Sequence, residues 1–504
     1  MGITKCRGQR YLWVDRLCII QDDNAAVHRS LNAIHQIFAK SALCLVALAG
    51  QDANHGLRGF RGISAPRSVD HVAFDMAGGD KLSWFNKPGP VWDRSYDGDA
   101  DNVDARPKRD VGSIWNERGW TYQEFIFAKR RLVFTDGPLR WVCLGGSLRE
   151  EALVAVGPDS LVQMPSVYRM EQPYPGLDGW ASLIASAFNE RHLRYQEDAL
   201  RAFLGVQNFM SGYFLGGLNY GHPDIFFDYS LVWEPLNDVE RRVASVVLPP
   251  EEDNLPSWSW LGWQGAFYFV CDSEYECIGT CDGIVEPVTQ WFAMQSPSTP
   301  PAERRAINCR WHQYKTLAQN DPGHVPKGWN RVDSGSGPPV YEFGDQRFRY
   351  PIPPPPSTEA SEPAVQLQFL FAKTYRAFFV PRRIRPEFNN SPQFERLMEL
   401  YSNTEELAGV LRVHKKLDID RFLAHGTAEF VAVAKGWTTE FSDYLMAPDE
   451  IEELRRRPGD RPRSACYFGL CIRWENGVAR RQGTGKILTD LLERDQEHVD
   501  LVLG

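Results

Sequence analysis

The chain has 504 residues, of which 43% are hydrophobic and 24% are charged. This is the balance of a globular protein, and the length is enough for about two or three domains. The formal net charge of −9 argues against a nucleic-acid-binding protein, which needs a clustered basic face. Tryptophan is unusually frequent, with 16 residues, and each indole needs an apolar pocket and a partner for its N–H.

The N-terminus carries no basic segment followed by an apolar one, so no secretory signal is predicted. The longest apolar run, residues 42–49, is too short to span a membrane, which takes about 20 residues. Ten cysteines are sparse for this length and indicate a reduced, cytoplasmic protein. The group formed by Cys271, Cys277, Cys281, Cys309 and His312 lacks the paired spacing of structural zinc sites, so free thiols are favoured over a metal site.

The first elements form a predicted strand–helix–strand unit. Residues 11–20 (YLWVDRLCII) read as a buried strand, and residues 27–38 place apolar side chains on one helical face. Residues 43–48 (LCLVAL) read as a second strand. Such a βαβ unit implies parallel pairing, and the continuous apolar runs imply a sheet covered on both faces.

The middle of the chain is more varied. Residues 51–116 are rich in Gly, Asp and Pro and are predicted to form a long, partly irregular insertion. Short strands are expected at residues 131–134 and 139–143, with Asp136-Gly137-Pro138 as the turn between them. Helices are expected at residues 181–189 and 197–209, before a Trp-rich segment at 255–265.

From about residue 266 the pattern is rich in β-structure, and a Pro-rich loop interrupts it at residues 351–363. Strands are predicted at residues 367–371, 377–380, 409–413 and 430–434. The dipeptide Asn476-Gly477 predicts a hairpin between residues 467–474 and 478–480, and a last helix is expected at 487–494. The predicted organisation is therefore an α/β domain over residues 1–150, a helical extension over 151–265 and a β-rich α+β region over 266–504.

Sequence motifs of well-known enzymes are mostly absent. There is no G-x-S-x-G elbow, H-E-x-x-H helix or kinase signature, and Gly483-Thr-Gly-Lys486 lacks the first glycine and the Ser/Thr of a phosphate-binding loop. No metal site or bound cofactor is predicted. One segment stands out, in which a carboxylate, Glu124, follows Trp120 by four residues. On a helix, Glu124 would lie one turn after Trp120 and could orient a ribose or stabilise a sugar cation.

The sequence leaves the roles of Glu124 and Asp15 undecided. The segment Thr121-x-x-Glu124 also fits a capping box with Thr121 as the N-cap, and from the residues alone this structural role is favoured. The carboxylate of Asp15 lies inside an apolar run, where burial would require a partner or a function.

At these residues the chain resembles the fungal heterokaryon-incompatibility (HET) domain. The resemblance is carried by YLWVDRLCIIQDD at residues 11–23, ALCLVALAG at 42–50, HGLRG at 55–59 and ERGWTYQEFIFAKRRLVF at 117–134. Weaker likeness continues downstream through residues 193–206, 217–233 and 255–263.

This resemblance implies a fungal non-self-recognition protein that promotes programmed cell death after hyphal fusion. It also implies a TIR-like or flavodoxin-like parallel sheet, because the family is regarded as a remote relative of TIR domains. Some TIR domains cleave NAD with a glutamate, so Glu124 is the expected catalytic residue. Asp15, Arg118 and Trp120 are expected to shape the substrate pocket, with NAD as substrate rather than as cofactor.

The resemblance departs from the family at its start. The family begins with a strand of the type LSY-x-WG well before the YLW motif, whereas only ten residues precede Tyr11 here. We therefore expect an incomplete, N-terminally truncated HET domain. The alternatives are a non-catalytic module that works through self-association or protein partners, and an inactive truncated copy.

Overall fold

A computed structural model gives the fold. It describes residues 4, 8–20, 22–60, 63–67, 71–75, 81–85, 113–144, 146–150, 180, 185–245, 255–269, 282–321, 323–333, 339–344, 346–353, 365–384, 394–439, 441 and 462–504. The chain divides into two compact units. The first unit comprises residues 1–166 and 201–206, and the second comprises residues 167–200 and 207–504.

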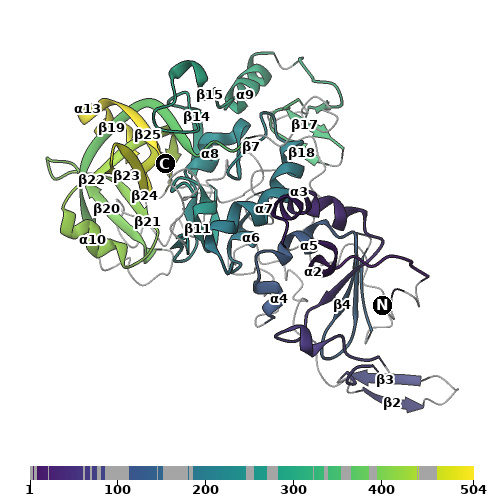
Figure 1. Ribbon diagram of the computed structural model, residues 1–504. Helices are drawn as coiled ribbons and strands as arrows, with labels where there is room; N and C mark the ends of the chain where they lie inside the picture. The colour runs from purple at the N-terminus through teal and green to yellow at the C-terminus, as the bar shows by residue number, and fades with distance from the viewer. Residues whose placement is uncertain are drawn as a thin grey trace. The chain divides into compact units, whose positions relative to one another are not determined.

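The first unit is a small α/β assembly whose strand β4 is labelled in Figure 1. Its four-stranded mixed sheet has the order β1-β4-β5-β6. Strands β1 and β4 are parallel, whereas β4, β5 and β6 pair antiparallel. The predicted α/β character is therefore confirmed, with one parallel pair in the sheet. Its elements are α2 (Asp15–Cys18), α3 (Asn24–Lys40), β1 (Cys44–Ala47), η1 (Ala53–His55), β2 (His71–Asp75), β3 (Lys81–Phe85), α4 (Ile114–Glu117), α5 (Thr121–Phe127), β4 (Arg130–Phe134), β5 (Arg140–Cys143) and β6 (Gly146–Arg149).

Helix α3 forms as the apolar spacing predicts. The side chain of Asp23 caps its N-terminus by accepting a hydrogen bond from the Ala26 amide at 3.0 Å. Ile34 and Phe38 are buried on the inner face of this helix. The strand predicted directly after it is also confirmed, because β1 lies at Cys44–Ala47 and pairs with β4.

The predicted strand over residues 11–20 is wrong. Residues 15–18 form the single helical turn α2, closed by hydrogen bonds from the Leu17 and Cys18 amides to the Val14 carbonyl. Tyr11, Leu17 and Ile20 are exposed. A strand forms only where a neighbouring strand satisfies its backbone groups, and in the described part of the first unit β1 pairs with β4 alone.

The second unit is rich in β-structure, as predicted. Its larger elements are α7 (Ala199–Ser211), α8 (Phe227–Leu231), α9 (Trp311–Asn320), β19 (Phe369–Arg383), β20 (Leu397–Tyr401), β21 (Leu407–Val413), α10 (Asp418–His425), β22 (Ala428–Thr438), β23 (Ser464–Glu475), β24 (Val478–Leu488), α13 (Thr489–Asp495) and β25 (Glu497–Leu503). Its shorter elements are α6 (Ala187–Asn189), η5 (Gln196–Asp198), β7 (Leu218–Asn219), β8 (His222–Pro223), η6 (Asp224–Phe226), β9 (Glu234–Pro235), β10 (Glu240–Arg241), η7 (Trp260–Gly262), β11 (Trp263–Gln264), β12 (Phe267–Tyr268), β13 (Asp282–Pro287), β14 (Phe292–Met294), η9 (Pro301–Glu303), β15 (Arg305–Ala306), β16 (Asn330–Val332), β17 (Val340–Phe343) and β18 (Gln346–Phe348).

The main sheet of the second unit closes on itself. Antiparallel pairing runs β22-β23-β24-β21-β20-β19, and β19 pairs back to β22 (Figure 1). The long strand β19 makes this closure possible, because its successive segments pair with β25, β22 and β20. Apolar side chains, among them Phe379, Leu411 and Phe430, fill the interior of the ring.

The predicted hairpin is confirmed by the pairing of β23 with β24. Its turn residues Asn476 and Gly477 both have positive φ, at 53° and 78°, which suits the twist of a two-residue hairpin. The segment Gly483–Lys486 lies within β24, and Lys486 is only 4% exposed, so it is part of the core and not a phosphate-binding loop.

Buried tryptophans organise the rest of the second unit. Trp233, Trp258 and Trp263 are buried, and their indole N–H groups donate to the carbonyls of Trp258, Gln368 and Ser257 at 2.9–3.0 Å. Each of these indoles therefore has the pocket and the partner that its chemistry requires.

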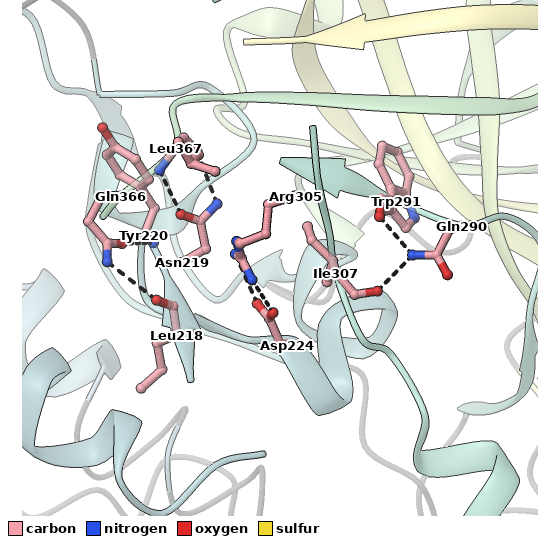
Figure 2. Close-up of polar contacts among 10 residues, drawn as sticks. All are labelled: Leu218, Asn219, Tyr220, Asp224, Gln290, Trp291, Arg305, Ile307, Gln366 and Leu367. Carbon is pink, nitrogen blue, oxygen red and sulfur yellow. Dashed lines mark hydrogen bonds and ion pairs between the residues drawn. The ribbon is translucent and has the colours of Figure 1, made fainter. Parts of the chain in front are cut away.

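Polar side chains connect segments of the second unit that are far apart in sequence (Figure 2). The amide of Asn219 exchanges two hydrogen bonds with the backbone of Leu367, at 2.9 and 3.0 Å. The carboxylate of Asp224 is fully buried and forms an ion pair with Arg305. The Asn219 bonds satisfy the backbone of Leu367, which lies just before strand β19, and the ion pair neutralises a buried carboxylate.

Several expectations fall wholly or partly outside the described residues. These are the cysteines at 271, 277 and 281, most of the 51–116 insertion and the centre of the Pro-rich loop. The described cysteines are free thiols. No helix in the described part of the chain has the length and apolarity needed to cross a membrane.

Candidate functional site

Helix α5 carries the candidate catalytic residue. Its remaining side chains, Thr121, Tyr122, Gln123, Phe125, Ile126 and Phe127, are buried. Glu124 is the residue of this helix that keeps partial exposure. A carboxylate at the edge of an otherwise buried helix has a fixed direction and remains accessible to a ligand.

Contacts on both sides fix the rotation of α5. The Nε2 atom of Gln123 donates to the Ala202 carbonyl at 2.8 Å. Gly205 leaves room for this contact, because a Cβ atom there would lie 2.1 Å from the Oε1 atom of Gln123. Arg131 donates from Nη1 to the Phe125 carbonyl at 2.7 Å, and its guanidinium lies 4.3 Å from the centre of the Phe125 ring. The direction of Glu124 is therefore set by the packing of its neighbours.

Glu124 acts electrostatically on the start of β1. Burial and, to a smaller extent, the charge of Glu124 raise the pKa of the Cys44 thiol to about 12, and Arg131 opposes them. Cys44 is therefore a neutral thiol near neutral pH and is not a nucleophile. Arg131 pairs with Cys44 in the parallel register and is 2% exposed, so a carboxylate and a guanidinium act on the same end of the parallel pair.

The capping-box interpretation of this segment is wrong. Helix α5 begins at Thr121, and Trp120 takes the N-cap position with helical dihedral angles. The Thr121 hydroxyl donates to the carbonyls of Trp115 and Arg118, at 2.5 and 2.8 Å, and so fastens the preceding turn. Glu124 is therefore not explained by a cap formed with Thr121.

The other residues expected at the site lie in two places. Arg118 is exposed at the end of α4, and Trp120 is half-buried at the start of α5, so both share one continuous segment with Glu124. Asp15 lies on α2 and is exposed, with its Oδ1 atom accepting from the Arg16 amide at 2.7 Å. The expectation of a buried Asp15 is wrong, because the strand that would have buried it does not form.

A second polar group lies at the opposite end of the parallel pair. The Oδ1 atom of Asp136 lies 2.9 Å from both His55 Nε2 and Arg58 Nε. Asp136 follows the end of β4, and the Leu48 and Ala49 amides that follow β1 donate to the Phe134 carbonyl. The group therefore lies beyond the carboxyl ends of both parallel strands, where open α/β sheets bind ligands.

This second group was not predicted as a site, although both of its segments stand out in the sequence. His55 and Arg58 belong to the HGLRG motif, whereas the sequence around Asp136 indicates only a turn. Gly50 shows how closely the segment is packed: its φ is 90°, and a Cβ atom there would lie 2.3 Å from the His55 ring. Sequence separation of 81 residues hides the contact between His55 and Asp136.

These two groups can support different chemistry. The carboxylate of Glu124 can stabilise positive charge on a bound sugar, and the His55–Arg58–Asp136 group can exchange a proton or bind an anion. Among the residues that the structure describes, no His, Cys, Asp or Glu cluster has the arrangement of a metal site.

One comparison with known protein families agrees with the resemblance of the N-terminal segment to the HET domain. A family model described as "Heterokaryon incompatibility protein (HET)" matches residues 1–124. No curated protein matches the chain. No solved structure matches it either. The matched region contains Asp15, His55, Arg58, Arg118, Trp120 and Glu124. Residues 1–124 of this chain are therefore similar to the HET domain, as the sequence motifs of that segment indicate.

Proposed function

We propose that this protein is a fungal heterokaryon-incompatibility protein that promotes programmed cell death after hyphal fusion. Its first unit would act in the cytoplasm by TIR-like cleavage of NAD. The family match over residues 1–124 supports the biological role. The observation that supports the chemistry is Glu124, the partly exposed carboxylate of a helix whose other side chains are buried.

In the proposed reaction the bond between ribose C1′ and the nicotinamide nitrogen breaks, and its electron pair leaves with nicotinamide. Positive charge develops on C1′ and the ring oxygen of the ribose. Water then adds to C1′ and releases a proton, which gives ADP-ribose, nicotinamide and H⁺. The Glu124 carboxylate would stabilise the positive charge, as carboxylates do in glycoside hydrolysis. Trp120 and Arg118, on the same segment, would line the pocket.

The test is nicotinamide release from NAD by the purified full-length chain, at high protein concentration to allow assembly. We expect release by the wild type, loss of release in Glu124→Gln and retention in Glu117→Gln. Glu117 is a matched control because it is an exposed glutamate on the adjoining helix α4. Circular dichroism would show that both variants fold. Equal release by wild type and Glu124→Gln, or no release by the wild type, would refute the enzymatic proposal.

One observation favours a second, non-catalytic function through self-association. Large apolar side chains are exposed on the segment before α3, namely Tyr11, Leu12, Leu17 and Ile20. Exposed apolar patches are typical of protein interaction sites. If the protein self-associates through this segment, Leu17→Glu should lower the molecular mass of the assembly measured in solution. Ile63→Glu, at an exposed position outside the segment, should leave that mass unchanged. In hyphae, cell death that persists in Glu124→Gln would favour this function over NAD cleavage.

A further inference from the structure

The second unit contains two adjoining cavities of different character. One has a volume of about 420 Å³ and a strongly charged lining. The other has a volume of about 500 Å³ and a largely apolar, aromatic lining. Arg421, Arg473 and Gln482 line both, so the two cavities share a wall. Each volume lies in the range of small-molecule sites, about 300–1,000 Å³.

The charged cavity is basic within a chain whose net charge is −9. Among the described residues, six cationic side chains line it and only two acidic ones, Asp418 and Glu475. The cationic residues are Arg241, Lys415, Arg421, Arg473, Arg480 and Arg481. The local charge is therefore opposite to that of the whole protein.

The hydrogen bonds of the lining leave this positive charge only partly neutralised. Arg241 donates to the backbone carbonyls of Gly262 and Leu255, and the charge that acts favourably on it is that of Glu475. Arg473 and Arg480 both lie against Glu475, with Arg480 Nε 3.8 Å from the carboxylate, so two cations share one anion.

The pKa shifts of the lining agree with a positive potential. Burial and, to a smaller extent, the nearby charge of Arg480 lower the pKa of Arg241 to about 10, and Glu475 opposes them. The pKa of His414 is well below its usual range because the ring is buried and because Arg481, Arg241 and Lys415 lie near it. A bound anion would relieve this repulsion.

The second cavity offers an apolar and aromatic surface. Phe378 is 40% exposed, and Trp474, Phe422, His425 and Ile472 line the cavity with it, beside Ala424, Thr427 and Glu429. The indole N–H of Trp474 donates to both carboxylate oxygens of Glu429, at 3.0 and 3.1 Å, so the ring is held in place before any ligand arrives.

We propose that these adjoining cavities bind a nucleotide, with the phosphates in the basic cavity and the base in the aromatic one. Arginines suit phosphate oxygens because the guanidinium donates hydrogen bonds as well as carrying charge. Aromatic side chains suit a base because every base has a flat face on which they can stack. The site lies entirely in the second unit and is independent of the NAD cleavage proposed for the first.

The test is calorimetric titration of the full-length chain with ATP, pyrophosphate and adenosine. ATP should bind more tightly than either fragment, and its affinity should fall as salt is added. Arg480→Gln and Trp474→Leu should each weaken ATP binding, about 10- to 100-fold for the arginine, as expected for the loss of a charged hydrogen bond. Arg382→Gln is the matched control, because this arginine pairs with Glu405 outside both cavities.

The variant Glu124→Gln tests whether this site is independent of the one proposed in the first unit. ATP should bind to that variant as tightly as to the wild type. Arg473→Gln provides a second basic-site variant if Arg480→Gln does not fold, because Arg473 is an exposed residue. No ATP binding, or binding that survives both Arg473→Gln and Trp474→Leu, would overturn the proposal. Pyrophosphate binding as tightly as ATP, or an RNA oligonucleotide binding more tightly, would overturn the assignment to a nucleotide.

Discussion

Replacing Glu234 by glutamine should destabilise the second unit by about 3 kcal/mol at neutral pH. Glu234 is 1% exposed, and its two oxygens lie 2.7 Å from Arg412 Nε and 3.4 Å from Lys486 Nζ. The Tyr268 hydroxyl also donates to it. Glutamine keeps the shape of the side chain but removes the charge, which leaves two buried cations without their shared anion.

The magnitude follows from the pKa of Glu234. Burial by itself would raise this pKa, but Lys486 and Arg412 together lower it from 4.5 to about 2. A pKa difference of one unit between the folded and unfolded states corresponds to about 1.36 kcal/mol, so this lowering stabilises the folded state by about 3 kcal/mol. Because the folded pKa is below the unfolded value, this stabilisation is complete above pH 4.5 and is lost as the pH falls toward 2.

The measurement is urea unfolding of the full-length chain at a series of pH values, followed by tryptophan fluorescence. The gap between wild type and Glu234→Gln should be about 3 kcal/mol at pH 7 and should shrink below pH 4.5. Glu405→Gln is the control: its exposed pair with Arg382 should contribute less than about 1 kcal/mol. A gap at pH 7 no larger than that of the control, or one that does not change with pH, would refute the reasoning.

Two further predictions concern buried contacts. Arg305→Ala should cost about 3 kcal/mol at pH 7, because it leaves the carboxylate of Asp224 buried without its partner. Since burial raises the pKa of Asp224 from 3.8 to about 6, this loss in urea unfolding should shrink as the pH falls below that value; a constant loss would contradict it. Gly50→Ala should destabilise the first unit by about 2 kcal/mol or more and displace His55 from Asp136, as read from the histidine NMR signals. Gly426→Ala, at a left-handed helix cap with open space around it, should cost only about 1 kcal/mol, and equal effects of the two would exclude the clash as the cause.

Local patterns predicted those elements whose stability is local. Helix α3 has its apolar face within 17 residues, and its cap, Asp23, directly precedes them. The hairpin β23–β24 is joined by an Asn-Gly turn that both favours positive φ and sets the pairing register. The likeness of residues 11–134 to the HET domain was also visible in the sequence, and the family match over residues 1–124 confirms it as far as residue 124.

Features that depend on distant partners were not predictable in this way. Residues 11–20 have the composition of a strand, but whether they form one depends on a neighbour to pair with. The Thr121-x-x-Glu124 pattern fits a cap, yet helix α5 begins at Thr121, so this residue is not the N-cap. Its hydroxyl donates to the Trp115 and Arg118 carbonyls of the preceding turn, a contact that the local pattern does not reveal.

By itself, the sequence of this protein determined an α/β first part, a β-rich second part, a HET-like segment and one carboxylate worth testing, Glu124. The tertiary structure decided that Asp15 is exposed, that His55 meets Asp136 across 81 residues, and that β19 closes a ring with β22. It also gathered the arginines of β10, β23, β24 and α10 around one cavity. The physical reason is that spacing along the chain encodes local hydrogen bonds and amphipathic faces, whereas burial and charge clustering depend on which distant segments pack together.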